Sequence, residues 1–442
     1  MKFRKIVACL LTAIMLTGML LTGCGTNSDK TDGTQATQTT QSNEPTAAAQ
    51  AQKEDVKLIF WDNCGDSQDA DSNIAIIKNF NDANTGIVIE RQTMDTDSLR
   101  NTIKPAMLSG SGPDIFSYEP SEAYLGVLAE AGLALDITPY VKKDQFLPVA
   151  FSKSTYNDKI YGICNQLEVL AIYYNKKIFK DLSLEVPKTY DEFIEVCKTI
   201  KKNNIIPLQF NNKDAWPGWH MYSIWYGAFA GRNIIDKALN GEIGFDDQHF
   251  VNALDSFAAL VKDGYTNPSP NAIGYDDGNK EFFAGKAAMT ATGTWLLGDV
   301  YKNLGEDAGI FVLPPATEDV PYAPAGGLGD AIVISAKTKY VEESMKFVEH
   351  YFSPESAKLM IETNGYVPPV EIDLNSLNVN PLFKEFIKLL DYSDSFSYPM
   401  DLTLSADVNE VTKNTFQQLT DGSITGKDAS AKIQEAYLKS KK

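Results

Sequence analysis

The segment VKLIFWDNCGD, residues 56–66, indicates the class of fold. Its first half is rich in β-branched and aromatic residues, as strands are, and its second half has the polar residues of a loop. The chain beyond it alternates between helical and strand patterns. These patterns predict helices over 74–83 and 99–107 and strands over 87–89 and 114–116. Such alternation through short connections predicts an α/β fold with a mainly parallel sheet and helices on both faces.

Polar and aromatic residues follow two of these strands. The loop 61–66 comes after the first strand and residues 117–119 come after the third, so we expect both on one rim of the sheet. Ligands of open α/β sheets bind beyond the carboxyl ends of the strands. The candidate ligand-binding residues of this rim are Trp61, Asp62, Asp66, Tyr118 and Glu119. Acidic residues of exposed loops are often only solvated, and that alternative stays open.

The remaining chain continues to alternate, with more helix. The apolar spacing predicts a strand over 331–334 and helices over 190–201, 216–229, 250–261, 340–352, 382–390 and 429–438. The helix over 216–229 carries three tryptophans, more than core packing requires. No internal repeat of solenoid length is visible.

The N-terminal residues have the pattern of an export signal. Three basic side chains precede an uncharged apolar run over 6–21, which is too short to span a membrane comfortably. The run ends in LTGC, residues 21–24, which resembles the lipobox of bacterial lipoproteins. This resemblance implies removal of residues 1–23 and a lipid on Cys24. We therefore expect an extracytoplasmic protein anchored to the cell membrane through Cys24; the alternative is an ordinary signal peptide with a chance cysteine.

The next segment has a different composition. Residues 25–54 are mainly Thr, Gln, Ser, Ala and Asn, which cannot bury enough apolar surface to offset the entropy of ordering. We expect residues 24–54 to be the lipidated cysteine and a flexible tether. No second hydrophobic stretch of spanning length follows in the sequence.

The overall composition and charge limit the classes of molecule that the protein can bind. The 442 residues are 43% hydrophobic and 22% charged, as in ordinary globular proteins. The formal net charge of −18 argues against nucleic acid as a partner, because a phosphate backbone requires a positive surface. We expect a monomer with neither a cofactor nor a metal site.

Four short patterns, in this order and spacing, resemble one protein family. They are GPDI at 112–115, YG at 161–162 followed by YYNK at 173–176, GKAAM at 285–289 followed by GTW at 293–295, and GG at 326–327. The chain resembles the extracellular solute-binding proteins of sugar ABC importers, the family of the maltose-binding protein. The resemblance implies two α/β lobes joined by hinge segments, a sugar in the cleft between them, and delivery of that sugar to permease subunits. It places lobe 1 at 55–166, lobe 2 at 167–320, a return to lobe 1 at 321–370, and C-terminal helices mainly on lobe 2 at 371–442.

The resemblance also implies candidate ligand contacts. A sugar site needs flat aromatic platforms and hydrogen-bonding carboxylates or amides. The candidates are Glu168, Trp216, Trp219, Trp295 and Gly327. The alternatives are a hinge salt bridge for Glu168, core packing for the tryptophans and a turn for Gly327. Trp225 is assigned to packing, and the number of aromatic residues favours an oligosaccharide.

The cysteines leave one question open. After loss of Cys9 and lipidation of Cys24, three remain. A disulfide between Cys64 and Cys164 is conceivable if their Cα atoms lie within about 7 Å of each other, and buried free thiols are the alternative. Cys197 repeats the apolar spacing of its helix and is expected in the core.

Enzymatic alternatives lack their motifs. The sequence has no Gly-x-Ser-x-Gly, no His-Glu-x-x-His, no phosphate-binding loop and no dinucleotide fingerprint. A secreted glycoside hydrolase remains the alternative, because it needs only two carboxylates and aromatic platforms. A surface adhesin without a small-molecule ligand is a third possibility. We expect a binding protein and no catalysis.

Overall fold

The computed structural model describes residues 55–64, 69–231, 233–318, 320, 324–374, 377–389 and 399–441, which all belong to one structural unit. The expected signal peptide, Cys24, the tether and Asp66 lie outside these residues.

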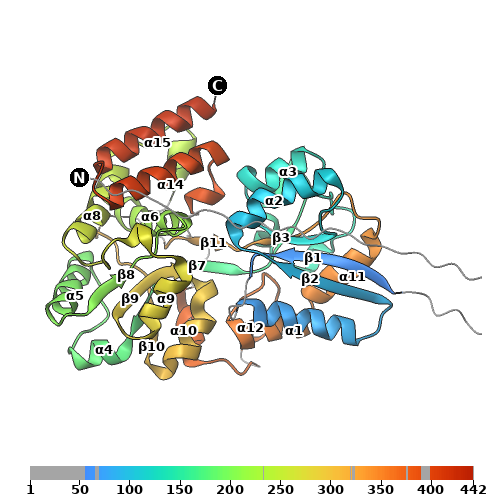
Figure 1. Ribbon diagram of the computed structural model, residues 1–442, viewed down its shortest axis with the longest axis horizontal. Coiled ribbons are helices and arrows are strands. Elements are labelled where there is room, and N and C mark those ends of the chain that lie inside the picture. The colour runs from blue at the N-terminus through green and yellow to red at the C-terminus, as the bar shows by residue number, and fades with distance from the viewer. Residues whose placement is uncertain are drawn as a thin grey trace, which may run out of the picture. The chain divides into compact units, whose positions relative to one another are not determined.

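The first of two large sheets has the strand order β2-β1-β3-β12-β6. Its strands β1, β2 and β3 are labelled in Figure 1. Its strands are β1 (Val56–Asp62), β2 (Ile87–Thr93), β3 (Ile115–Tyr118), β6 (Ile163–Cys164) and β12 (Ala331–Ile334). β1 pairs in parallel with β2 and β3, whereas β12 is antiparallel to both β3 and β6. All strands except β12 therefore run in one direction, and their carboxyl ends share one edge.

Alternating side chains of β1 explain why helices cover both faces of this sheet. Leu58 and Phe60 pack into one apolar cluster, and Ile59 and Trp61 pack into another. The helices on the first face are α1 (Asp69–Asp82), α11 (Val341–Tyr351) and α12 (Pro354–Asn364). Those on the second are α2 (Thr96–Ser109), the π-helical segment η1 (Glu122–Gly126) and α3 (Val127–Glu130).

The second sheet has the strand order β10-β7-β9-β8. Its strands are β7 (Leu167–Asn175), β8 (Ile206–Gln209), β9 (Ala287–Gly293) and β10 (Ala308–Phe311). β9 and β10 are antiparallel to β7, and β8 is parallel to β9. β7 is thus the single strand of opposite direction. Because it lies between β10 and β9, only the β8–β9 pair of this sheet is parallel, although three of its four strands share one direction.

Helices cover both faces of the second sheet as well (Figure 1). On one face are α4 (Lys176–Asp181), α5 (Tyr190–Lys202), α6 (Trp216–Ala230), α7 (Ile234–Leu239), α8 (Gln248–Lys262), α14 (Ala406–Thr420) and α15 (Gly426–Ser440). On the other are α9 (Tyr275–Phe283), α10 (Leu297–Leu304) and α13 (Pro381–Leu389). The short elements are β4 (Thr155–Tyr156), β5 (Lys159–Ile160), β11 (Gly326–Leu328) and the 3₁₀ turns η2 (Lys143–Gln145), η3 (Pro148–Phe151), η4 (Pro270–Ala272), η5 (Thr294–Leu296), η6 (Gly305–Asp307) and η9 (Met400–Leu402).

The chain crosses between the sheets more than once. β6 belongs to the first sheet and β7 to the second, so the first crossing is at 165–166. β11 pairs with the start of β7, and β12 returns to the first sheet after 329–330. α12 packs on α1, and α13 packs on β10 of the second sheet. The expected helices and strands are present with ends shifted by a few residues, and the two-lobed α/β fold is confirmed.

Candidate functional site

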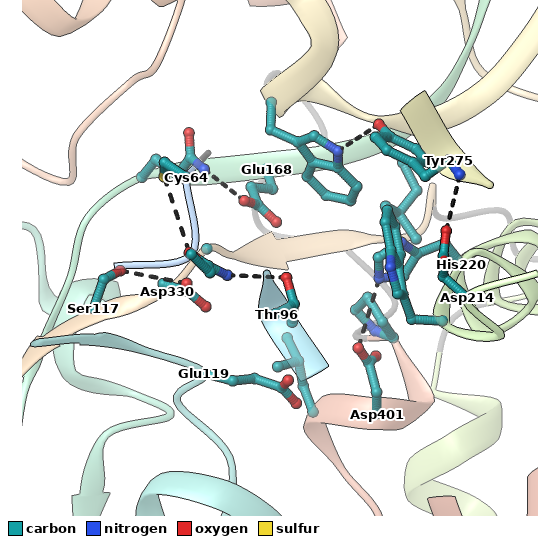
Figure 2. A pocket seen from close by; sticks show the side chains of 18 of the residues that line it. Cys64, Thr96, Ser117, Glu119, Glu168, Asp214, His220, Tyr275, Asp330 and Asp401 are labelled. Atoms are coloured by element: carbon teal, nitrogen blue, oxygen red, sulfur yellow. Dashed lines mark hydrogen bonds and ion pairs between the residues drawn. The ribbon is translucent and has the colours of Figure 1, made fainter. Parts of the chain in front are cut away.

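A cavity of about 660 Å³ lies between the two sheets (Figure 2). Residues that follow β1 and β3 line it from the first lobe, and residues that follow β8 and β9 line it from the second. The carboxyl ends of both sheets therefore supply the walls, as expected for open α/β sheets.

Four rings from the second lobe form one side of the cavity, here called the aromatic wall: Trp216, His220, Tyr275 and Trp295. The ring centroids of Trp216 and Tyr275 are 4.6 Å apart, and those of His220 and Trp295 are 5.1 Å apart. The Trp295 Nε1–H donates to the Tyr275 hydroxyl oxygen at 2.8 Å. Both tryptophans are half-buried, so the aromatic wall offers apolar surface to the cavity.

The local sequence explains how Trp295 is positioned. β9 ends at Gly293, and the Trp295 ring folds back over that glycine. A Cβ at position 293 would lie 1.8 Å from the ring, so only glycine permits this placement. The Gly-x-Trp pattern at 293–295 therefore has a steric basis.

The first lobe contributes a charged group centred on Arg100, which lies near the start of α2. Its guanidinium donates to the Glu119 carboxylate, and its Nη1 is 3.3 Å from Asp97 Oδ1. The guanidinium carbon also lies 4.6 Å from the centroid of the Tyr124 ring. Arg100 is thus held by two carboxylates and a ring before any ligand binds.

Glu119 has an unusual pKa. Burial raises it to about 8, and the negative charges of Asp401 and Asp330 act in the same direction against the opposing effect of Arg100. Asp330 accepts a hydrogen bond from the Ser117 hydroxyl at 3.3 Å, and loss of hydration raises the pKa of Asp330 too.

The raised pKa of Glu119 predicts how the stability of the fold depends on pH. The folded-state pKa lies above the value of 4.5 for an unperturbed glutamate, so the folded protein retains a proton that the unfolded chain has released. This contribution to stability is fully present below pH 4.5 and is lost as the pH rises through about 8. We expect Glu119→Gln to flatten the decrease in unfolding free energy between pH 5 and 8, measured by urea denaturation. Equal slopes for the wild type and Glu119→Gln would contradict the assignment, and Glu195→Gln, an exposed carboxylate on α5, is the control.

Asp401 and His220 connect the aromatic wall to the charged group. Asp401 Oδ2 lies 3.6 Å from His220 Nε2, and Asp401 is only 5% exposed. Asp401 Oδ1, His220 Nδ1, Arg100 Nε and Asn165 Oδ1 are buried and have no hydrogen-bond partner among the described residues. All four of these residues line the cavity. Buried polar groups in folded proteins are normally paired, so these atoms are candidates for ligand hydrogen bonds.

Several sequence-predicted candidates do line this cavity: Glu119, Glu168, Trp216, Trp295 and Gly327. Glu168 accepts a hydrogen bond from the Gln166 side chain at 2.6 Å. Gly327 pairs with Glu168 across β11 and β7 and has a φ of 154°, a backbone conformation that favours glycine. The structure therefore brings together candidates that are more than 200 positions apart in the chain.

Four other candidates do not line the cavity. Trp61 packs against α2 and donates from Nε1 to the Gln92 side chain at 2.8 Å. Tyr118 is buried and makes an edge-to-face contact with Phe116. Trp219 is 1% exposed, because α6 is covered by α8 and α14 as well as by the sheet. Trp61 and Tyr118 lie at the ends of β1 and β3, and Trp219 lies near Trp216 on α6, but tertiary packing buries all three.

Asp62 is the fourth candidate outside the cavity. It is fully buried and accepts from Arg91 Nε at 2.6 Å and Nη2 at 2.9 Å. The Asn73 side chain also donates to it at 3.1 Å. Asp62 thus joins β1, β2 and α1, and we no longer propose it, Trp61, Tyr118 or Trp219 as ligand contacts.

Several cavity residues were not among the candidates from the sequence: Arg100, His220, Tyr275, Asp330 and Asp401. His220 could have been found, because it lies one helical turn after Trp216 on α6. Asp401 gave no comparable signal, since it reaches the cavity from a segment near the C-terminus. Trp225, by contrast, is fully buried, as expected for packing.

The cysteine question is settled by Cys164. Its thiol is free and buried in β6, so no Cys64–Cys164 disulfide forms. Burial raises the pKa of the Cys164 thiol. Cys197 is also buried in its helix, as expected.

Two features are absent from the described part of the chain. None of its helices has the length and apolarity needed to cross a bilayer. No group of three or more His, Cys, Asp or Glu side chains there is arranged to hold a metal ion.

Comparison with known proteins places this architecture in a family. The family model described as bacterial extracellular solute-binding protein matches residues 75–371. The chain belongs to this family. The resemblance derived from the four short patterns is therefore confirmed at the family level, and the protein is extracytoplasmic.

Individual relatives are similar over most of this solute-binding protein. The multiple sugar-binding protein of Streptococcus mutans is 27% identical over 76% of this chain and 81% of its own length. The maltotriose-binding protein of Pyrococcus abyssi is 31% identical over 63% of this chain and 59% of its own. Among solved structures, a chitin oligosaccharide binding protein has a TM-score of 0.80 and 21% identity, and the alignment covers 88% of this chain and 99% of that one. The last comparison supports the fold.

Proposed function

We propose that this solute-binding protein captures an oligosaccharide in the cavity between its lobes and delivers it to the permease of an ABC importer. The observation that carries the proposal is the pairing of an aromatic wall with unpartnered buried polar atoms from both lobes. Sugar rings present an apolar face and a rim of hydroxyl groups, and this pairing matches both. The names of the Streptococcus and Pyrococcus relatives support a sugar ligand.

Binding is an equilibrium coupled to closure of the lobes. Arg100, Asn165 and Asp330 come from the side of the first sheet, whereas the aromatic wall comes from the second lobe. A sugar that contacts both sides favours the closed state through its greater affinity for that state. The permease then recognises the closed pair of lobes. No catalytic step belongs to this mechanism, and the protein acts as a monomer.

The location follows from the N-terminal sequence. Acyl chains on Cys24 anchor the protein to the cell membrane, and residues 25–54 tether the binding lobes to that anchor. Fractionation of cells that express Cys24→Ser tests this part of the proposal, because the variant should leave the membrane fraction.

The experiment for the ligand is a thermal-shift screen of residues 55–442 with mono- and oligosaccharides. A sugar at 100 times its Kd should add about 2.7 kcal/mol to the unfolding free energy and raise Tm measurably. Each hit is then incubated for a day and analysed by chromatography. Recovery of the intact sugar supports a binding protein. Cleavage of the sugar would favour the glycoside hydrolase instead, and no shift with any sugar would contradict the proposed ligand class.

A further inference from the structure

Carboxylates dominate the charge of the cavity. Glu119, Glu168, Asp330 and Asp401 line its inner part (Figure 2), and Asp276 and Asp277 line it from α9. Among the described residues, the cavity's only lysine and arginine side chains are Lys280 and Arg100. Although its raised pKa of about 8 leaves Glu119 mostly protonated at pH 7, the other carboxylates of the cavity still outnumber Arg100 and Lys280.

Both cations already have carboxylate partners. Arg100 contacts Glu119 and Asp97, as described above. Lys280 Nζ lies 3.1 Å from Asp277 Oδ1, one turn away on the same helix. A negatively charged ligand would therefore have to break one of these pairs to gain a cationic partner.

Two buried oxygen atoms of cavity residues lack a hydrogen-bond donor. Asp401 Oδ1 and Asn165 Oδ1 are buried oxygen atoms that can only accept hydrogen bonds. Both residues are more than nine-tenths buried. A sugar hydroxyl can donate to them, whereas a ligand carboxylate cannot and would be repelled by Asp401. Burial is the main cause of the high pKa of Glu119, and the negative charges of Asp401 and Asp330 add to it.

We propose that the cavity selects oligosaccharides by charge: it accepts sugars with hydroxyl substituents and excludes sugars that carry carboxylate or sulfate groups. This inference rests on the proposed sugar-binding function. The acidic side chains would provide a specificity that the aromatic wall cannot, since stacking does not distinguish a neutral sugar from its uronic counterpart.

The test uses matched pairs of ligands. Each pair is a neutral tetrasaccharide of hexose residues (malto-, cello- or N-acetylchito-series) and the same chain with the C6 hydroxymethyl group of one residue oxidised to a carboxylate. Isothermal titration calorimetry at pH 7 and low salt should give a Kd about tenfold or more higher for the acidic member, because like charges are weakly screened there. The ratio should shrink at 0.5 M salt. Equal or tighter binding of an acidic member overturns the inference and leaves the sugar-binding function intact, whereas absence of binding by every pair overturns both.

Variants on two helices distinguish the effect of the cavity charge on binding from the effect of the protein's total charge. Asp277→Asn removes a cavity carboxylate and releases Lys280, so we expect the ratio of the two Kd values to fall by about threefold. The matched control is Glu195→Gln, which breaks the pair with Lys198 at the same spacing on α5, away from the cavity. The ratio should stay unchanged in the control. An equal change in both variants would contradict selection by the cavity.

Discussion

Replacement of Trp216 by alanine is expected to weaken oligosaccharide binding at least 30-fold while it changes the stability of the fold little. Trp216 is half-buried at the start of α6 and lines the cavity. Its ring packs mainly against Tyr275 and His220 of the aromatic wall. Loss of a central aromatic contact costs about 2 kcal/mol or more of binding free energy, which corresponds to roughly a 30-fold change in Kd.

Trp225→Ala is the matched control on the same helix. Trp225 is fully buried and contacts Phe193 and Phe257 at centroid distances of 6.2 and 5.1 Å. Its loss should lower the unfolding free energy by about 3–5 kcal/mol. Calorimetric titration and urea denaturation of both variants check the contrast. Unchanged affinity in a folded Trp216→Ala protein would remove the aromatic wall from the binding site.

Trp295→Ala is less informative than Trp216→Ala, although Trp295 also lines the cavity. The Trp295 ring packs against three apolar clusters, from both lobes. Its removal should therefore reduce both affinity and stability. Trp216 separates the two effects better.

Arg91→Ala is expected to lower the unfolding free energy by about 3–5 kcal/mol, because it leaves the buried Asp62 carboxylate without its counter-charge. Asp62 has no exposed surface, and Arg91 reaches it with two nitrogen atoms. The Asn73 amide would remain as a neutral donor and cannot compensate a buried charge.

The same pair of strands supplies the control. Lys57 on β1 and Glu90 on β2 form an exposed ion pair with an N–O distance of 3.0 Å. Lys57→Ala should cost less than about 1 kcal/mol, since exposed pairs contribute little. Urea denaturation at pH 7 measures both variants. Similar losses for Arg91→Ala and Lys57→Ala would show that Asp62 does not need its partner. Recovery of stability in the double variant Asp62→Leu with Arg91→Met would support the proposed cause.

The alternation of strands and helices was readable from residues 56–116, because β1, α1, β2, α2 and β3 follow one another with short connections and regular apolar spacing. The rim after β1 and β3 was placed correctly for the same reason. The directions of β7 and β12 were not readable, since each strand pairs with segments more than 100 positions away in the chain.

The sequence did not reveal which side chains point into the cavity and which point into the core. Trp216 and Trp219 are both apolar and three positions apart, and nothing in their local sequence distinguishes the cavity wall from the core. The difference arises in the tertiary structure: Lys413 of α14 lies over the Trp219 ring, with its Nζ 4.9 Å from the ring centroid, whereas Trp216 contacts the rings of the aromatic wall. The burial of Asp62 was not readable from its local sequence either, since its partner Arg91 lies on a different strand, β2.

Local patterns of the sequence were therefore sufficient for the helices, the strands, the family and the place of Trp295 beside the cavity. These features depend on residues that are close in the chain or on motifs such as Gly-x-Trp, whose steric basis is local. The folded chain was needed to bring Arg100, Glu119, Asp330 and Asp401 into one cavity from four separate segments. Electrostatic interactions depend on distance and burial in space, so the charge of the cavity, and with it the expected selection of neutral sugars, becomes visible only after the lobes have folded.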